Sequence, residues 1–173
     1  MNSQSEVAPE VSIVVPAFNE AEGLAVFLQQ LFDVLRGCTA SHEVWVIDDG
    51  SRDATWERLK AELPRYPQLR GLRFTRNFGK EAAILAGLRQ ARGQSVVVMD
   101  ADLQDPPEEI PGMIARWKEG CKVVFAERTS RKEGFFRRML FAAFYKFFLL
   151  LSDLPVVIQS GVFSLMDRTV VNH

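Results

Sequence analysis

The sequence predicts an α/β protein in which a mostly parallel sheet is covered by helices on both faces. Short runs rich in valine and isoleucine alternate along the chain with segments whose apolar residues recur at helical spacing, which is typical of strands joined by crossover helices. The run Val96 to Met99 is continuously apolar, as expected for a strand that is buried in a parallel sheet. With 173 residues the chain is long enough for one domain with its own core, and we expect a Rossmann-like sheet.

Three strand–helix units fill the first half of the chain. The expected strands are Val11 to Val15, Val44 to Ile47 and Leu69 to Phe74. Helical spacing predicts a helix after each of them, marked in turn by Leu24, Leu28, Leu31, Phe32 and Leu35, by Trp56, Leu59 and Leu63, and by the span Phe78 to Ala91. Gly37 is expected to end the first helix, Ser51 or Asp53 to cap the second, and Asn77 to cap the third.

The second half begins with a strand over Ser95 to Met99. A helix start is predicted after it, with Asp105 as the N-cap, Pro106 as the first helical residue and Glu108 as the capping-box partner. Its buried stripe is expected to consist of Ile110, Met113, Ile114 and Trp117, and Gly120 to end it. A fifth strand is predicted over Val123 to Ala126.

Two carboxylates follow the predicted strand that ends at Met99. Asp100 and Asp102 stand two positions apart, so in extended backbone their side chains face the same way. They can converge on one divalent cation, with the amide oxygen of Gln104 nearby. Oxygen ligands of this kind suit Mg²⁺ or Mn²⁺, the ions that neutralise a diphosphate. The alternative is that the two aspartates only cap a turn.

Polar clusters also follow two other predicted strands, at Pro16 to Glu20 and at Asp48 to Ser51. The carboxyl ends of parallel strands share one edge of a sheet, where open α/β sheets bind their ligands. Five carboxylates would gather there, namely Glu20, Asp48, Asp49, Asp100 and Asp102. Without a partner they would raise one another's pKa. We therefore expect a cation and a ligand with hydrogen-bond donors, such as the ribose diol and base N–H of a nucleoside.

Composition and missing motifs argue against several classes of protein. The formal net charge is −1, so nucleic acid is not an expected partner. No G-x-G-x-x-G follows the first strand and no Gly-Lys-Ser/Thr loop occurs, which disfavours a dinucleotide site and an NTPase. Cys38 and Cys121 match no metal or redox spacing. No signal peptide is visible, and no stretch of ~18 uncharged apolar residues predicts a membrane span.

Four segments, taken together and in this order, resemble family 2 glycosyltransferases. They are SIVVPAFNE (12–20), VIDDGSRDAT (46–55), RNFGKEAAILAGL (76–88) and VVVMDADLQDPPEEIP (96–111). The resemblance covers about Val11 to Val171 and is to the polyprenyl-phosphate sugar transferases, such as dolichol-phosphate mannosyltransferase and undecaprenyl-phosphate glucosyltransferases. It implies a GT-A fold and inverting transfer of a hexose from a nucleotide-diphosphate sugar to undecaprenyl or dolichyl phosphate. The third segment is closer to the undecaprenyl branch, which suggests a donor of the UDP-glucose type and leaves the GDP-mannose type open.

The same resemblance implies roles for single residues. Those that match nucleotide contacts of the family are Pro16, Phe18 and Glu20 in the first loop, Asp48 and Asp49 beside the base and ribose, and Asp100 and Ala101. Asp102 and Gln104 match the metal ligands, so Asp102 and Asp100 are the expected catalytic residues. Structural alternatives exist for two of them: Phe18 can be a core aromatic and Pro16 a strand terminator.

Basic residues stand before the predicted helix that begins near Phe78. Helix N-termini and basic side chains favour anions, so Arg76 or Lys80 is expected to meet a phosphate of the donor, and we assign Lys80 to the nucleotide-sugar site. The alternative is a solvated surface.

The chain becomes basic and aromatic from Arg128 onward. A predicted helix carries one apolar face made of Phe136, Met139, Leu140, Ala143, Phe147 and Leu150. Such a C-terminal amphipathic helix is typical of a membrane interface, with an ordinary core helix as the alternative. A lipid-phosphate acceptor needs cations, and the family carries them in this region, so Arg128, Arg131 and Arg138 are the candidates. We expect a cytoplasmic protein, peripheral to the inner face of the membrane.

Two departures from the family pattern leave alternatives open. Val162 stands where many relatives have the aspartate of Gly-Asp-Phe, and the chain stops at His173, where relatives usually continue. We expect a disordered leader (1–10), a nucleotide-sugar-binding core (11–130), and an interfacial helix with an acceptor-side segment (131–173) that is truncated relative to the family. The alternatives are a catalytically degenerate domain that binds nucleotide sugar or membrane, and a soluble glycosyltransferase with a sugar hydroxyl as acceptor.

Overall fold

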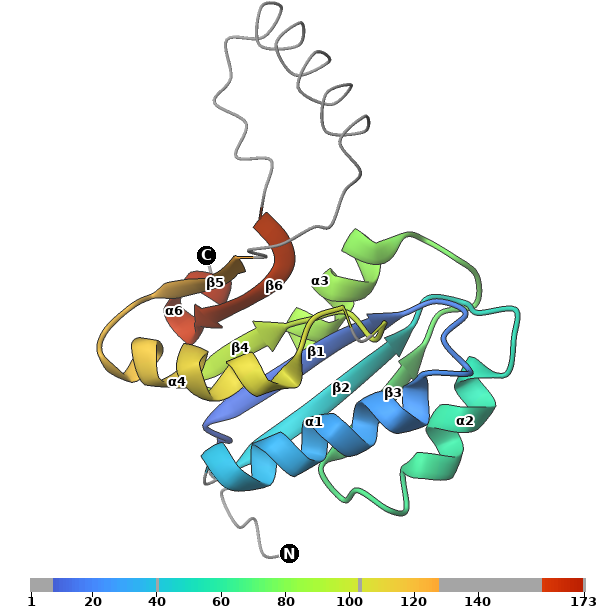
Figure 1. Cartoon of the computed structure of the whole chain (residues 1–173). Coiled ribbons are helices and arrows are strands. Elements are labelled where there is room, and N and C mark those ends of the chain that lie inside the picture. Colours follow the sequence, from blue (N-terminus) through green and yellow to red (C-terminus); the bar gives the residue numbers. More distant parts are fainter. Residues whose placement is uncertain (1–7, 40, 103, 128–159, 173) are drawn as a thin grey trace, which may run out of the picture. The chain divides into compact units, whose positions relative to one another are not determined.

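The computed structural model describes residues 8–39, 41–102, 104–127 and 160–172. These residues form a six-stranded sheet with the strand order β3-β2-β1-β4-β6-β5 (Figure 1). The strands are β1 (Val11–Ala17), β2 (His42–Asp48), β3 (Leu69–Arg73), β4 (Ser95–Val98), β5 (Val123–Glu127) and β6 (Ser160–Asp167). Apart from Glu127, Ser160 and Gly161, all of these described residues belong to one compact unit.

The predicted α/β fold with a mostly parallel sheet is confirmed. Strand β1 is parallel to both of its neighbours, with Val11 opposite His42 of β2 and Ser95 of β4, and β2 is parallel to β3. The strand that the sequence did not predict is β6, which runs antiparallel to β4. The sheet is therefore mixed, and the carboxyl ends of β1, β2 and β4 lie at one edge.

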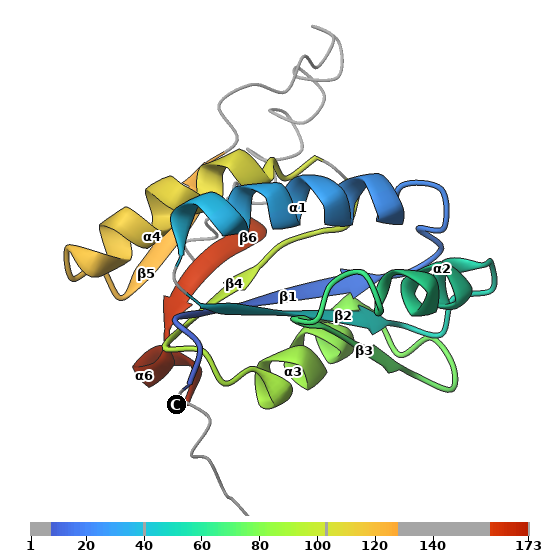
Figure 2. The same cartoon turned by 90° about the horizontal axis from the view of Figure 1, so that it is seen from below.

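Helices cover both faces of this sheet. They are α1 (Leu24–Cys38), α2 (Thr55–Glu62), α3 (Lys80–Gln90), α4 (Ile110–Lys118) and α6 (Arg168–Val171), with a 3₁₀ turn η1 (Pro107–Glu109) before α4. Figure 2 shows α1 and α4 over one face and α3 over the other. No helix within the described residues has the length and apolar character needed to cross a membrane.

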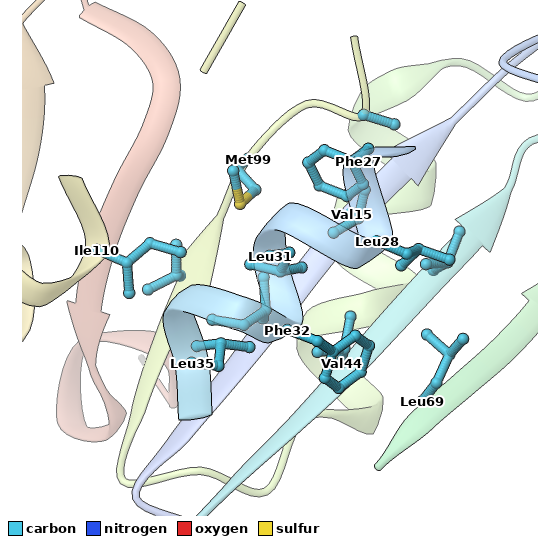
Figure 3. Packing of buried hydrophobic residues seen from close by; sticks show 14 of the residues in the cluster. Val15, Phe27, Leu28, Leu31, Phe32, Leu35, Val44, Leu69, Met99 and Ile110 are labelled. Carbon is cyan, nitrogen blue, oxygen red and sulfur yellow. The ribbon is translucent and has the colours of Figure 1, made fainter. Parts of the chain in front are cut away.

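The main core lies between α1 and the sheet. The apolar stripe of α1 is buried, and its members are Leu24, Phe27, Leu28, Leu31, Phe32 and Leu35. Figure 3 shows the members of this stripe from Phe27 to Leu35 packing toward Val15, Val44 and Met99 on the sheet side and toward Ile110 of α4. The predicted helical spacing of this segment is confirmed. Full burial of each large side chain contributes about 1.5–3 kcal/mol.

On the opposite face, α3 approaches β1 very closely. A Cβ at Gly87 would overlap the side chain of Val14, so only glycine allows this approach. The helix connects β3 to β4 and runs against the strand direction, which brings its first residue, Lys80, to the carboxyl edge of the sheet. The position of Lys80 is thus fixed by the packing of a helix.

Strand β1 continues through Pro16 to Ala17. The alternative that Pro16 terminates the strand is therefore wrong. The carbonyl of Val14 bonds to Met99 on the β4 side, and that of Ala17 bonds to Asp49 on the β2 side. Because alternate residues face opposite neighbours, Pro16 faces the β4 side, where the ladder has already ended at Val14. Its missing N–H therefore costs no ladder hydrogen bond.

The N-caps predicted from the sequence are wrong at three helices. They are Ser51 or Asp53 for α2, Asn77 for α3 and Asp105 for the helix start before α4. Helices α2 and α3 follow Ala54 and Gly79, and α4 follows its 3₁₀ turn. At Ser51 and Asp105 the physical reason is that the side chain bonds to the backbone of a loop instead of capping a helix. The Ser51 hydroxyl accepts the N–H of Asn19, and the Asp105 carboxylate accepts that of Asp100.

Candidate active site

A cleft of about 280 Å³ opens at the carboxyl edge of β1, β2 and β4. Its lining comes from four loops and consists of Pro16, Ala17, Phe18, Glu20, Asp49, Asn77, Gly79, Lys80, Asp100, Ala101 and Asp102. The three polar clusters that the sequence placed at strand ends are therefore brought together. Two predicted site residues, Asp48 and Gln104, do not line the cleft.

Hydrogen bonds fix the loop after β1 against the loop after β2. The N–H of Asn19 donates to the Ser51 hydroxyl at 2.9 Å, and the Asn19 side chain accepts the N–H of Arg52 at 2.9 Å. The N–H of Glu20 donates to the Thr55 hydroxyl at 2.8 Å. Asn19 has a φ of 59°, a left-handed conformation that asparagine tolerates better than most residues. The loop that presents Phe18 and Glu20 is thus held in one place.

Asp48 supports the site from beneath. Its side chain is fully buried, accepts the N–H of Ser51 at 2.9 Å and forms an ion pair with Nε of Arg73 at 3.1 Å. Both carboxylate oxygens thus face groups of the protein, and Asp48 holds the turn that follows β2. Asp48 does not line the cleft, and the nucleotide contact predicted for it stays a prediction.

Asp49 connects the end of β2 to the turn before α3. Its two carboxylate oxygens accept the backbone N–H groups of Phe78 at 2.7 Å and Gly79 at 3.0 Å, and the residue is 3% exposed. The next residue, Gly50, has a φ of 66°, and a Cβ there would overlap the backbone of Arg76. The two hydrogen bonds to Asp49 and the close approach of Gly50 therefore hold this turn against the end of β2.

Lys80 forms an ion pair across the cleft with Asp100. Its ammonium lies 2.6 Å from Oδ1 and 2.7 Å from Oδ2 of that carboxylate. Both side chains keep partial exposure, 40% and 21%, so a ligand can reach them. Arg76, the other basic candidate, stacks its guanidinium 4.6 Å from the centre of the Phe78 ring and does not line the cleft.

The loop after β4 presents Asp102 and Gln104. Both residues are exposed, and Oδ1 of Asp102 accepts the N–H of Gln104 at 3.0 Å. Asp105 is almost fully buried and accepts the N–H of Asp100 at 3.1 Å, which anchors this loop. Within the described ranges no three acidic, histidine or cysteine side chains are grouped to hold a metal ion. A carboxylate and an amide oxygen do fit Mg²⁺ or Mn²⁺, which completes its shell with water and ligand phosphate oxygens.

The expected repulsion among the carboxylates is visible at Glu20. Partial burial raises the pKa of this carboxyl above its ordinary value, and the negative charges of Asp102, Asp100 and Asp53 raise it further. Among the described residues that line the cleft, the basic side chain is that of Lys80, whereas four side chains are acidic, namely Glu20, Asp49, Asp100 and Asp102. The site thus carries more negative charge than its own cation balances.

The structure also decides between the two alternatives for Phe18 and shows where Val162 packs. Phe18 lines the cleft and is 39% exposed, so it is not a core aromatic. Val162 packs against the apolar cluster that includes Val14, Val96 and Val98. Arg128, Arg131, Arg138 and the predicted interfacial helix lie outside the described residues.

Sequence reasoning missed Asn77 and Gly79 as cleft residues and Asp105 as the anchor of the Asp100 loop. The sequence predicts Asn77 and Asp105 only as helix caps. The signal that was available is the glycine of the Asn-Phe-Gly-Lys segment, because glycine is favoured where a turn needs a positive φ, and Gly79 has a φ of 100°.

Known proteins are similar to this chain along most of its length. Residues 12–173 match the family model described as glycosyl transferase family 2. The chain is 43% identical, over 95% of its length, to the uncharacterized glycosyltransferase YkcC of Bacillus subtilis (strain 168), of which the match covers 51%. It is 39% identical, over 95% of its length, to the bactoprenol glucosyl transferase of Shigella phage SfV, of which the match covers 54%. The chain thus spans about half the length of these curated relatives.

Among solved structures, the mannosyltransferase PcManGT from Pyrobaculum calidifontis in complex with GDP-Man and Mn²⁺ has a similar fold. The TM-score is 0.58 at 25% identity, and the match covers 76% of this chain and 39% of that one. The mixed α/β sheet and the family match point the same way. This chain belongs to glycosyl transferase family 2.

Proposed function

We propose that this chain is the donor-binding part of an inverting glycosyltransferase that moves a hexose from a nucleotide-diphosphate sugar to a polyprenyl phosphate. The observation that carries the proposal is the cleft at the carboxyl edge, where Glu20, Asp100 and Asp102 lie around one lysine. A diphosphate with its cation would balance this charge. A relative at 39% identity is named a bactoprenol glucosyl transferase, which supports a lipid-phosphate acceptor.

Asp102 and Gln104 are the proposed ligands of Mg²⁺ or Mn²⁺, together with oxygens of the diphosphate. The similar structure of PcManGT is named as a complex with GDP-Man and Mn²⁺, which supports a divalent ion here. When bound, such an ion neutralises the negative charge that develops on the leaving diphosphate.

Side chains of this protein would position the rest of the donor. Phe18, exposed at the rim, offers a ring on which the base can stack. Lys80 can exchange its bond to Asp100 for one to a phosphate oxygen, since its Nζ is the cationic donor among the described cleft residues. Pro16 and Ala101 line the same cleft.

In the proposed reaction an oxygen of the acceptor phosphate attacks the anomeric carbon. A new carbon–oxygen bond forms as the bond to the diphosphate breaks, and the nucleoside diphosphate leaves on the opposite side with inversion. A phosphate monoester has a second pKa near ~6 and is already largely ionised at neutral pH, so no strong general base is required. Arg128, Arg131 and Arg138 are the proposed cations for the acceptor phosphate.

A lipid acceptor also implies a location. We propose that the protein works at the inner, cytoplasmic face of a membrane, with its cleft open to water-soluble donors. Basic residues near an anionic leaflet each contribute roughly 1 kcal/mol of binding free energy, and the segment from Arg128 to Arg138 contains five of them, namely Arg128, Arg131, Lys132, Arg137 and Arg138.

The test uses the full chain with Mn²⁺ or Mg²⁺. Binding of UDP-glucose and of GDP-mannose is measured by calorimetry with and without EDTA, and transfer is assayed to a short polyprenyl phosphate and to a free sugar. We expect metal-dependent binding of one donor and transfer only to the polyprenyl phosphate. Transfer only to the free sugar would favour a soluble enzyme, and binding without any transfer a non-catalytic domain. No metal-dependent binding of either donor would refute the proposal.

A further inference from the structure

Asn77 lines the cleft without a structural task of its own. It is exposed, and its side chain makes no hydrogen bond within the part of the chain that the structure describes. Its backbone, in contrast, packs tightly against Gly50. A Cβ at Gly50 would lie only 2.7 Å from the backbone nitrogen of Asn77. The two residues that follow Asn77 donate their N–H groups to Asp49. A free amide is thus presented to the cleft from a fixed turn.

The order of the strands gives the cleft two distinct ends. Strands β2 and β4 flank β1 on opposite sides. Asp49, at the end of β2, contacts the turn that bears Asn77, whereas Asp100, at the end of β4, holds Lys80. On the proposed function, on which this inference rests, the diphosphate and its cation lie at the β4 end with Asp102. The nucleoside is then left for the β2 end.

Few polar side chains are free at the β2 end of the cleft. Pro16, Ala17 and Phe18 offer apolar surface to the flat faces of a base. Both oxygens of Asp49 already accept backbone N–H groups. Among the described lining residues, the amide of Asn77 is therefore the side chain at this end with both a donor and an acceptor available.

We propose that Asn77 reads the hydrogen-bonding edge of the donor's base and so helps to determine which nucleotide is accepted. An amide pairs with a neighbouring donor and acceptor on a base, such as the N–H and carbonyl of uracil. A carboxylate in its place can only accept. It would be repelled by the two carbonyls that flank the N–H of uracil and attracted by the adjacent N–H and NH₂ groups of guanine.

The experiment measures dissociation constants of UDP and GDP, each with Mn²⁺, for the full chain and for two variants, Asn77→Asp and Asn77→Ala. Asn172→Asp, the same change at an exposed position after α6, is the matched control. Asn77→Asp is expected to shift the UDP-to-GDP preference toward GDP by roughly tenfold or more, the size of one good base contact. Asn77→Ala is expected to weaken binding of the preferred nucleotide and to reduce the difference in affinity between UDP and GDP.

The outcomes separate this inference from the proposed function. If wild-type protein binds neither nucleotide, the proposed function fails. If wild-type protein binds one nucleotide and all three variants keep the same preference, the proposed function stands and the role of Asn77 is refuted. Thermal unfolding followed by circular dichroism verifies that each variant is folded. Because Asn77 is exposed, substitutions there should change the stability little.

Discussion

The two edges of the sheet both carry acidic side chains, but in opposite electrostatic states. At the amino edge, Glu43 is buried and accepts the Ser12 hydroxyl at 2.7 Å and the N–H of Arg92 at 2.6 Å. Asp167 accepts hydrogen bonds from Thr169 and from the Trp117 indole, and these bonds hold its pKa far below its usual range. At the carboxyl edge the pKa of Glu20 is raised instead.

The difference shows which charges serve the fold and which serve a ligand. Carboxylates at the amino edge have their donors within the protein, so they are stable without any partner molecule. A hollow of about 440 Å³ beside His42 lies at the same edge, yet its charged residues have partners within the protein: Asp33 pairs with Arg36, and Arg65 pairs with Glu62. The cleft at the carboxyl edge keeps unbalanced negative charge, which a cation and a diphosphate can neutralise.

The largest effect is expected at the carboxyl edge, for Asp102→Asn. This change removes a proposed metal ligand, so we expect transfer to fall by about 100-fold or more. Because Asp102 is exposed, the free energy of unfolding should stay within about 0.5 kcal/mol of wild type. Steady-state transfer and urea unfolding measure the two quantities. Asp33→Asn, a change of the same kind on α1, is the control, and full activity of Asp102→Asn would contradict the assignment.

The opposite result is expected at the amino edge, for Glu43→Ala. The hydroxyl of Ser12 and the N–H of Arg92 lose their common acceptor, so the free energy of unfolding should fall by about 2 kcal/mol. Nucleotide affinity should not change at temperatures where the variant is folded. Glu43→Gln keeps an acceptor oxygen and should lose clearly less stability. A loss of nucleotide affinity in folded Glu43→Ala would break the distinction between the two edges.

Lys80→Ala is expected to have an intermediate effect, about tenfold weaker binding of UDP or GDP with Mn²⁺, since one charged contact to phosphate is lost. The variant also leaves the Asp100 carboxylate without its ion pair. Lys60→Ala on α2, where the lysine lies 3.7 Å from exposed Glu57, serves as the control. Equal affinities for the Lys80→Ala and Lys60→Ala variants would show that Lys80 balances Asp100 without contacting the ligand.

The sequence predicted the elements of the fold well because their signals are local and repeated. The buried stripe of α1 and the parallel strands β1 to β4 follow from apolar spacing alone. The three strand-end clusters could also be placed together, because a parallel sheet brings such ends to one edge.

The partners of individual polar residues could not be predicted in the same way. Asp48 and Asp49 are neighbours with the same side chain, yet Asp48 pairs with Arg73 inside the protein and Asp49 lines the cleft. Asp105 resembles a helix cap but bonds to the backbone of Asp100. These choices depend on loops that approach each other from distant parts of the sequence, and no local pattern encodes them.

The smallest effect concerns pH and Glu20. A pKa raised above its ordinary value of 4.5 means that the folded protein holds this proton more tightly than the unfolded chain. Its stabilising contribution is therefore present at acid pH and lost as the pH rises through the raised pKa. Glu20→Gln removes the charge, so it should be more stable than wild type at pH 7, by less than about 1 kcal/mol because the group is partly exposed.

Urea unfolding between pH 4 and 7 measures this difference in stability between Glu20→Gln and wild type. The difference should close below pH 4.5 and should narrow when Mn²⁺ and nucleotide are added. A gap that is unchanged by Mn²⁺ and nucleotide would mean that the charge at this edge is not balanced by the ligand.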